Sequence, residues 1–211
     1  MKLVKTSSVI KKIYPKYIWD IPTTEKAIYL TFDDGPTPEV TPWVLKVLKE
    51  FSASATFFCI GRNVVACPEI FDQIRENGHG IGNHTYSHFK GWDTATEQYL
   101  EDVSKCQEIV NSRFFRPPYG KILRKQGRLL LEEYQVIMWD VLTYDYEMDL
   151  KVKDILRKII DATSSGSIVV YHDSVKSFDN LKKMLPVYLE HFSKQGYQFK
   201  ALDVNLSDEI H

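Results

Sequence analysis

Residues 26–36 read KAIYLTFDDGP, and the interpretation of the whole chain starts from this stretch. The apolar run 27–32 is typical of a buried strand, and the glycine and proline that close the stretch indicate a turn. Asp33 and Asp34 therefore stand side by side at the carboxyl end of a buried strand. Adjacent like charges near a core are unfavourable unless something positive compensates them. A compensating positive charge is therefore expected from another part of the chain.

Strand-like and helix-like segments alternate along almost the whole chain. The predicted strands cover residues 27–32, 54–60, 80–84, 113–117, 134–141, 167–173 and 197–202. The predicted helices between them cover residues 41–52, 67–79, 94–111, 122–133, 151–163 and 178–195. This alternation is typical of a parallel α/β architecture with about seven β/α units. The first βα turn carries neither a Gly-x-Gly-x-x-Gly pattern nor a Walker loop, which argues against a dinucleotide or nucleoside triphosphate site.

The composition indicates one globular domain. The 211 residues are 44% hydrophobic and 26% charged, and the formal net charge of -1 gives no electrostatic reason to expect a nucleic-acid partner. No segment approaches the ~18 apolar residues of a membrane span. The N-terminus has no apolar run of signal-peptide length, so a cytoplasmic location is the default and an extracytoplasmic one stays open. We expect residues 1–24 to be a peripheral N-terminal extension and residues 25–205 to be a single domain.

Ionisable side chains collect at the ends of the predicted strands, where parallel α/β folds carry their chemistry. They are Asp33, Asp34, His84, His88, Arg116, Asp140, Asp145, His172 and Asp173. The run HTYSH (84–88) places two histidines four residues apart, so on a helical turn both imidazoles could reach one ion. Zinc sites combine such nitrogens with a carboxylate, and a dication would compensate the paired aspartates. Two surface or capping histidines are the alternative.

Four motifs together resemble one known family. TFDDG (31–35), HTYSH (84–88), RPPYG (116–120) and VVYH (169–172) follow the order and rough spacing of the polysaccharide deacetylases. These are the NodB-homology enzymes of carbohydrate esterase family 4, which remove acetyl groups from N-acetylated sugars. The similarity spans about residues 26–203. It implies a distorted (β/α) barrel of about seven units rather than an open sheet.

The resemblance also implies a metal centre and a base. Asp34, His84 and His88 would bind one divalent metal ion, with zinc as the default and cobalt or nickel as alternatives. Asp33 would be the general base that deprotonates the attacking water. Arg116 would pair with Asp33 and hold it ionised, although taken alone it could be a surface arginine before a Pro-Pro turn.

The remaining implied roles concern the acid, the oxyanion and the acetyl pocket. His172 would be the general acid that protonates the departing amine; on its own it could be a satisfied core histidine. The backbone N–H of Tyr119 would donate to the oxyanion. Trp139, Tyr146 and Val170 would help form the apolar pocket around the acetyl methyl group.

One motif departs from the family pattern. The family has Asp-x-x-Asp-Trp after RPPYG, whereas this chain has Leu142-Thr143-Tyr144-Asp145-Tyr146. The first aspartate of that motif is expected to orient the general-acid histidine, and Leu142 cannot do so. Asp140 lies two residues earlier and points to the same side of a regular strand, so it is the predicted substitute partner of His172. Asp173 is a weaker candidate.

The leading hypothesis is a metal-dependent hydrolase that removes N-acetyl groups from a chitin-like oligosaccharide, peptidoglycan or a small sugar. A hydrolase of a non-sugar amide or cyclic imide on the same fold is one alternative. A carbohydrate-binding homologue with impaired catalysis, as the change at Leu142 suggests, is the other.

Overall fold

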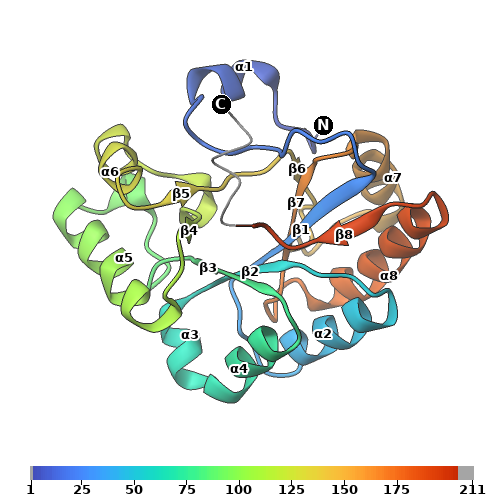
Figure 1. The fold of residues 1–211 in the computed structure, drawn as a ribbon, viewed down its shortest axis with the longest axis horizontal. Coiled ribbons are helices and arrows are strands. Elements are labelled where there is room, and N and C mark those ends of the chain that lie inside the picture. Colours follow the sequence, from blue (N-terminus) through green and yellow to red (C-terminus); the bar gives the residue numbers. More distant parts are fainter. Residues whose placement is uncertain (1, 204–211) are drawn as a thin grey trace.

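The computed structural model of the chain describes residues 2–203, which form one curled sheet surrounded by helices (Figure 1). The strands are β1 (Ala27–Asp33), β2 (Thr56–Cys59), β3 (Gly80–Asn83), β4 (Phe114–Phe115), β5 (Gln135–Val136), β6 (Val141–Leu142), β7 (Ile168–His172) and β8 (Gln198–Lys200). Their order is β5-β4-β3-β2-β1-β7-β6, with β8 beside β1, and every pairing of these strands is parallel. The distorted barrel predicted from the sequence is confirmed. The predicted domain end at residue 205 lies outside the described residues.

The helices lie outside the sheet (Figure 1). They are α1 (Ser8–Ile13), α2 (Val40–Glu50), α3 (Gly61–Ala66), α4 (Pro68–Glu76), α5 (Thr96–Val110), α6 (Arg124–Leu130), α7 (Val152–Ala162) and α8 (Phe178–Lys194), with short 3-10 turns η1 (Gly91–Asp93) and η2 (Pro118–Gly120). The predicted apolar stripe of α2 is buried at Val44, Leu45, Val47 and Leu48. β1 is buried along its whole length at the centre of the sheet, so its end is fixed from both sides. Within the described residues, every helix is too short or too polar to cross a bilayer.

The predicted strand 134–141 is in fact two strands. β5 pairs with β4 and β6 pairs with β7, at opposite ends of the sheet, so this segment crosses the opening of the barrel. The residues between the two strands, such as Ile137 and Met138, stay buried during the crossing. The apolar pattern therefore continues through the break and does not reveal it.

The N-terminal segment fills this opening. Isolated bridges connect it to the crossing segment at Ile18–Ile137, to β6 at Lys5–Val141 and to the residue before β7 at Asp20–Ser167. Tyr17, Trp19 and Ile21 are buried against the barrel. The description of residues 1–24 as peripheral is therefore wrong for this part, because its alternate apolar side chains close the seam between β5 and β6.

Candidate active site

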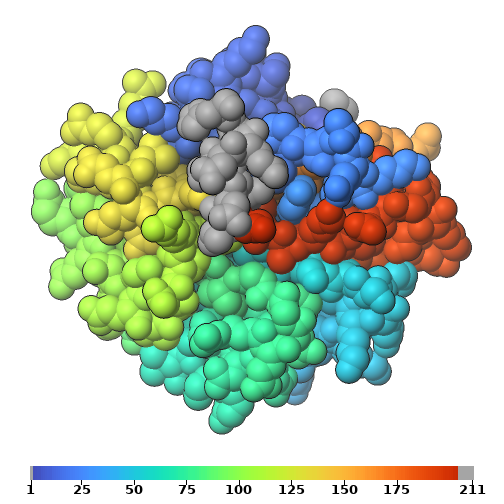
Figure 2. Space-filling view, viewed as in Figure 1, coloured from blue at the N-terminus to red at the C-terminus, as the bar shows by residue number. Residues whose placement is uncertain are grey.

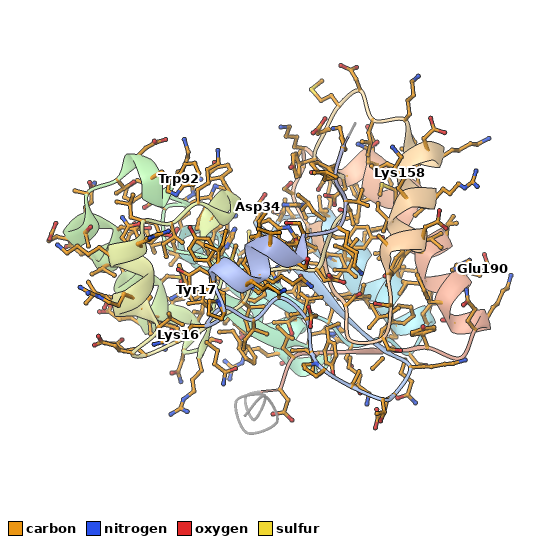
Figure 3. The ribbon with its side chains drawn as sticks, turned by 90° about the horizontal axis from the view of Figure 1, so that it is seen from above. Lys16, Tyr17, Asp34, Trp92, Lys158 and Glu190 are labelled. Atoms are coloured by element: carbon orange, nitrogen blue, oxygen red, sulfur yellow. The ribbon has the colours of Figure 1, made fainter. Side chains whose placement is uncertain are left out.

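The carboxyl ends of the strands surround a cleft of about 540 Å³, a volume within the usual range for small-ligand sites. In Figure 3, Asp34 lies at the base of a notch between the half of the molecule that carries Trp92 and the half that carries Lys158 and Glu190. The predicted site residues that line the cleft are Asp33, Asp34, His84, His88, Tyr119, Trp139, Tyr146, Val170 and His172. Leu142 also lines it, together with Lys121, Ser174 and Lys176.

Arg116 lies directly behind this cleft and is fully buried. Its guanidinium donates to Asp33 Oδ1 at 2.6 Å, to Thr31 Oγ1 at 2.8 Å and to the carbonyls of Ile137 and Met138. A buried arginine with all these partners cannot be a surface residue, and it supplies one positive charge to the aspartate pair. The predicted Asp33–Arg116 pair is confirmed as a contact.

His84 and His88 both approach Asp34. Their Nε2 atoms lie 3.7 Å and 3.1 Å from Asp34 Oδ1, and the ligand atoms of all three residues lie within 4.8 Å of one another. The segment after β3 is an irregular loop, in which Thr85 and His88 have φ of 61°. The expectation of a helical turn was therefore wrong, although the two imidazoles do come together as predicted.

Hydrogen bonding and burial prepare these three groups as ligands. His84 Nδ1 lies 2.8 Å from the carbonyl oxygen of Arg116, which can only accept, so Nδ1 carries the proton and Nε2 faces Asp34 with a free lone pair. Burial lowers the pKa of His84 to about 4, which keeps the ring neutral. Burial opposes ionisation of Asp34, but the hydrogen bond from His88 and the nearby histidine charges outweigh it and lower the pKa of Asp34. The neutral His84 ring with its free Nε2 lone pair, the neighbouring His88 imidazole and an ionised carboxylate form a ligand set that fits a divalent metal ion.

The partner of His172 is Asp145. His172 Nδ1 lies 2.7 Å from Asp145 Oδ1, and the His172 backbone N–H donates to Asp145 Oδ2 at 2.8 Å. Asp145 is fully buried and its own carbonyl accepts from Asn180 Nδ2, so the carboxylate is held in place. Burial lowers the pKa of His172, but the charge and hydrogen bond of Asp145 outweigh it and raise that pKa to about 9. His172 is therefore held as an imidazolium at neutral pH, and it is no ordinary core histidine.

Asp140 is not the substitute partner that the sequence suggested. Its N–H bonds to the carbonyl of Ile168, which places it four residues before His172 along the neighbouring strand. At about 3.3 Å per residue, this separation is about 13 Å. Its carboxylate instead binds Lys5, Lys11 and Ser167. Asp145 was visible as an ionisable residue near a strand end, but a regular-strand argument could not show that the chain turns back toward β7 after Leu142.

Asp173, the weaker candidate, supports the loop that carries the paired aspartates. It accepts from the Gly35 N–H at 3.1 Å and from Thr41 Oγ1 at 2.5 Å. A Cβ on Gly35 would lie 2.0 Å from Asp173 Oδ2, so only glycine fits at that point of the loop. Burial raises the pKa of Asp173 to about 7.

Aromatic and apolar side chains form the walls of the cleft. The Tyr146 ring packs edge-on against His172 at 4.9 Å between centroids, and Trp139 packs against Gly120 where a Cβ would lie 2.5 Å from its ring. Tyr119 Oη lies 3.2 Å from His88 Nδ1, and the Tyr119 backbone has φ of 60°. The lysines Lys121 and Lys176 at this cleft were missed, because nothing in their sequence surroundings distinguishes them from other surface lysines.

The chain is similar in sequence to several known deacetylases. Residues 20–136 match the family model described as Polysaccharide deacetylase. A peptidoglycan-N-acetylglucosamine deacetylase of Bacillus cereus is 33% identical over 193 residues, which cover 86% of this chain and 88% of the relative. A second such relative from Bacillus cereus is 34% identical over 182 residues, which cover 81% of this chain but only 66% of the relative. A chitooligosaccharide deacetylase of Azorhizobium caulinodans is 37% identical over 164 residues, which cover 72% of this chain and 76% of the relative.

Solved structures share the fold. A crystal structure of a peptidoglycan N-acetylglucosamine deacetylase, in complex with 4-naphthalen-1-yl-N-oxidanyl-benzamide, superposes with a TM-score of 0.80 at 31% identity and covers 93% of this chain and 95% of that one. A family 4 pseudoenzyme from Bacillus anthracis superposes with a TM-score of 0.75 at 22% identity, covering 92% of this chain and 68% of that one. At 22% identity the second likeness shows the fold alone. Because a deacetylase and a pseudoenzyme share this fold, the fold does not decide whether a chain is active. That decision rests on the residues of the cleft.

Proposed function

Because this chain belongs to the polysaccharide deacetylase family, we propose that it removes N-acetyl groups from N-acetylglucosamine residues of peptidoglycan or a chitin-type oligosaccharide. Members of this family are hydrolases that act on the amide bonds of N-acetylated sugars. One observation supports the proposal most strongly. A single cleft contains a His/His/Asp ligand set, a buried aspartate paired with arginine, and a histidine paired with a buried aspartate.

Asp34, His84 and His88 would hold one divalent ion, with zinc as the default and cobalt or nickel as alternatives. When bound, such an ion polarises the acetyl carbonyl and lowers the pKa of a coordinated water toward about 7. The three side chains need little rearrangement for this role. His84 is already held in the neutral tautomer with Nε2 toward Asp34, and the carboxylate is ionised.

Asp33 serves as the general base. Arg116 occupies its Oδ1, which leaves Oδ2 to accept the proton of the attacking water. The same contact with the buried guanidinium holds the Asp33 carboxylate in one orientation at the edge of the cleft. A positioned base typically contributes about 10²–10⁴-fold to the rate.

His172 serves as the general acid. Asp145 holds Nδ1, so the proton on Nε2 is the one that the imidazolium gives to the amine nitrogen as the carbon–nitrogen bond breaks. The carbonyl carbon gains its new bond to the water oxygen, and acetate and a free amine leave. The raised pKa of His172 keeps this proton available at neutral pH.

The cleft walls favour a small apolar acyl group. The backbone N–H of Tyr119 donates to the oxyanion, an interaction that typically contributes about 3 kcal/mol. Trp139, Tyr146 and Val170 surround the acetyl methyl group. Leu142 extends this apolar wall. An apolar residue at this position leaves the general acid His172 with its carboxylate partner, because that partner is Asp145.

Acetate release tests the proposal. Zinc-loaded protein is incubated with N-acetylglucosamine oligomers and with peptidoglycan, and acetate and free amine are quantified. Asp33→Asn should lower the rate about 10²-fold or more, whereas Asp72→Asn, the same change at an exposed position of α4, should leave the rate unchanged. Stoichiometric zinc with no acetate from either glycan would favour a binding homologue or a hydrolase of another amide.

A further inference from the structure

Helix α1 presents an apolar face to solvent. Val9, Ile10 and Ile13 are 62%, 44% and 54% exposed, and no residue of this helix is buried. Val9 and Ile13 are four residues apart and Ile10 is three from Ile13, so the three side chains share one side of the helix. We name these three residues the α1 ridge. Single exposed apolar residues are common, but three on one short helix need an explanation.

Lys11 binds the opposite side of α1 to the protein, so the apolar side faces solvent. Lys11 lies about 200° around the helix from both Val9 and Ile13, on the opposite side of α1. Its ammonium group donates to Asp20 and, at 2.6 Å, to the buried Asp140. The charged residue therefore faces the protein and the apolar ones face away, the reverse of an ordinary surface helix. Figures 1 and 2 show the result, with α1 protruding at the edge of the molecule.

A basic groove adjoins the α1 ridge. It has a volume of about 510 Å³, and Ile13 belongs to both features. Its other lining residues are Tyr14, Pro15, Lys16, Tyr17, Arg124, Arg128, Leu131 and Glu132. Three cations thus face one carboxylate, and Lys12 on α1 adds a further charge. Four cations of this region form no salt bridge with the residues that the structure describes: Lys12, Lys16, Arg124 and Arg128.

We propose that the α1 ridge and the adjoining groove dock this protein on an anionic phospholipid surface. Aliphatic side chains on a protruding helix enter the interfacial region of a bilayer, and flanking lysines and arginines attract its phosphate groups. Tyrosine favours this boundary, and Tyr14 is a partly exposed tyrosine directly after the ridge.

Charge distinguishes this occupant from a second copy of the chain. A two-fold dimer would bring the same patch of both subunits together and so oppose Lys12, Lys16 and the two arginines with themselves. An anionic lipid surface complements these charges. The catalytic cleft also stays accessible, since Figure 3 places Lys16 and Tyr17 apart from Asp34 and its notch. The docking does not depend on the proposed activity.

Vesicle co-sedimentation of the full chain tests this inference. Vesicles of phosphatidylcholine with 30 mol% phosphatidylglycerol are compared with pure phosphatidylcholine, in 0.05 M and 0.5 M NaCl. We expect at least a tenfold higher partition coefficient on the anionic vesicles at low salt, and at least a tenfold loss of it at high salt.

Paired variants separate the apolar and electrostatic contributions. Val9→Ser/Ile10→Ser/Ile13→Ser should lower partitioning at least tenfold, whereas Val65→Ser/Val187→Ser, at exposed apolar positions elsewhere, should not. Lys12→Gln/Lys16→Gln should also lower it, whereas Lys46→Gln/Lys49→Gln on α2 should not. Circular dichroism and thermal unfolding confirm that each variant is folded.

Three outcomes would overturn the inference. They are equal binding to both vesicle types, unchanged binding of the triple serine variant, and a wild-type dimer in sedimentation velocity that this variant abolishes. The last outcome would assign the α1 ridge to contact between two copies of the chain.

Discussion

Replacing Asp145 with asparagine should lower the pKa of His172 below its ordinary value of 6.5. In the wild-type protein, burial lowers this pKa, and Asp145 is the largest of the influences that raise it to about 9. Asparagine keeps the size of the side chain but removes the charge 2.7 Å from His172 Nδ1. Burial is the largest of all the influences on His172, so it should then outweigh the remaining charges of Asp34 and Asp33, which favour the imidazolium.

The expected shift is large. A fall from about 9 to below 6.5 exceeds two pKa units, which corresponds to about 3 kcal/mol of lost preference for the charged ring. At pH 7.5 the acid would change from almost fully protonated to mostly neutral, so acetate release should fall at least about tenfold. The protonated His172, paired with Asp145, stabilises the folded wild-type protein. Because its pKa is raised on folding, this stabilisation is fully present below pH 6.5 and is lost as the pH rises through about 9.

The direct assay is an NMR titration of the His172 ring in protein stripped of divalent ions, alongside the pH dependence of acetate release in zinc-loaded protein. Asp140→Asn is the matched control. It changes another buried aspartate, bound to Lys5 and Lys11, and should leave the His172 pKa unchanged. A His172 pKa in Asp145→Asn within half a unit of wild type would refute the reasoning, and so would a large shift in the control.

Three other predictions concern the metal site, the seam and Leu142. Zinc at 100 times its Kd should stabilise the wild-type protein by about 2.7 kcal/mol in thermal unfolding, and an equal gain in His84→Ala would contradict the assigned ligands. Asp140→Asn should cost about 2 kcal/mol at pH 7 in urea unfolding. Burial raises the pKa of Asp140, but Lys11, Ser167 and Lys5 outweigh burial and lower it in the folded protein. The stabilisation by Asp140 is therefore present above about pH 4 and is lost in acid. A difference in unfolding free energy between wild type and Asp140→Asn that stays constant down to about pH 2 would argue against these ion pairs. Leu142→Asp should not raise the rate of acetate release, because His172 already has a carboxylate partner, and a higher rate would show that Asp145 does not suffice.

Local sequence patterns predicted most of the fold. Strand runs such as 27–32 and 167–173 alternate with amphipathic helices, and such patterns depend only on burial of one segment at a time. The split of residues 134–141 was not predictable in this way. Its residues remain buried on both sides of the barrel opening, and only the change of partner from β4 to β7 ends the strand.

The N-terminal segment had a signal that could have been used. Tyr17, Trp19 and Ile21 alternate with other residues at the period of a strand, which is typical of a segment packed against a sheet. The pairing of His172 with Asp145 lacked such a signal. It depends on how the loop after β6 turns back toward β7, and Asn180 of a distant helix fixes that turn.

Acetate release by zinc-loaded protein from N-acetylglucosamine oligomers, measured side by side for wild type and Asp33→Asn, shows whether Asp33 activates the attacking water. Each cleaved amide should yield one acetate and one free amine, and Asp33→Asn should release acetate at a rate at least about 10²-fold lower than wild type. Acetate released at the wild-type rate by Asp33→Asn would contradict this role of Asp33, because another group would then activate the water.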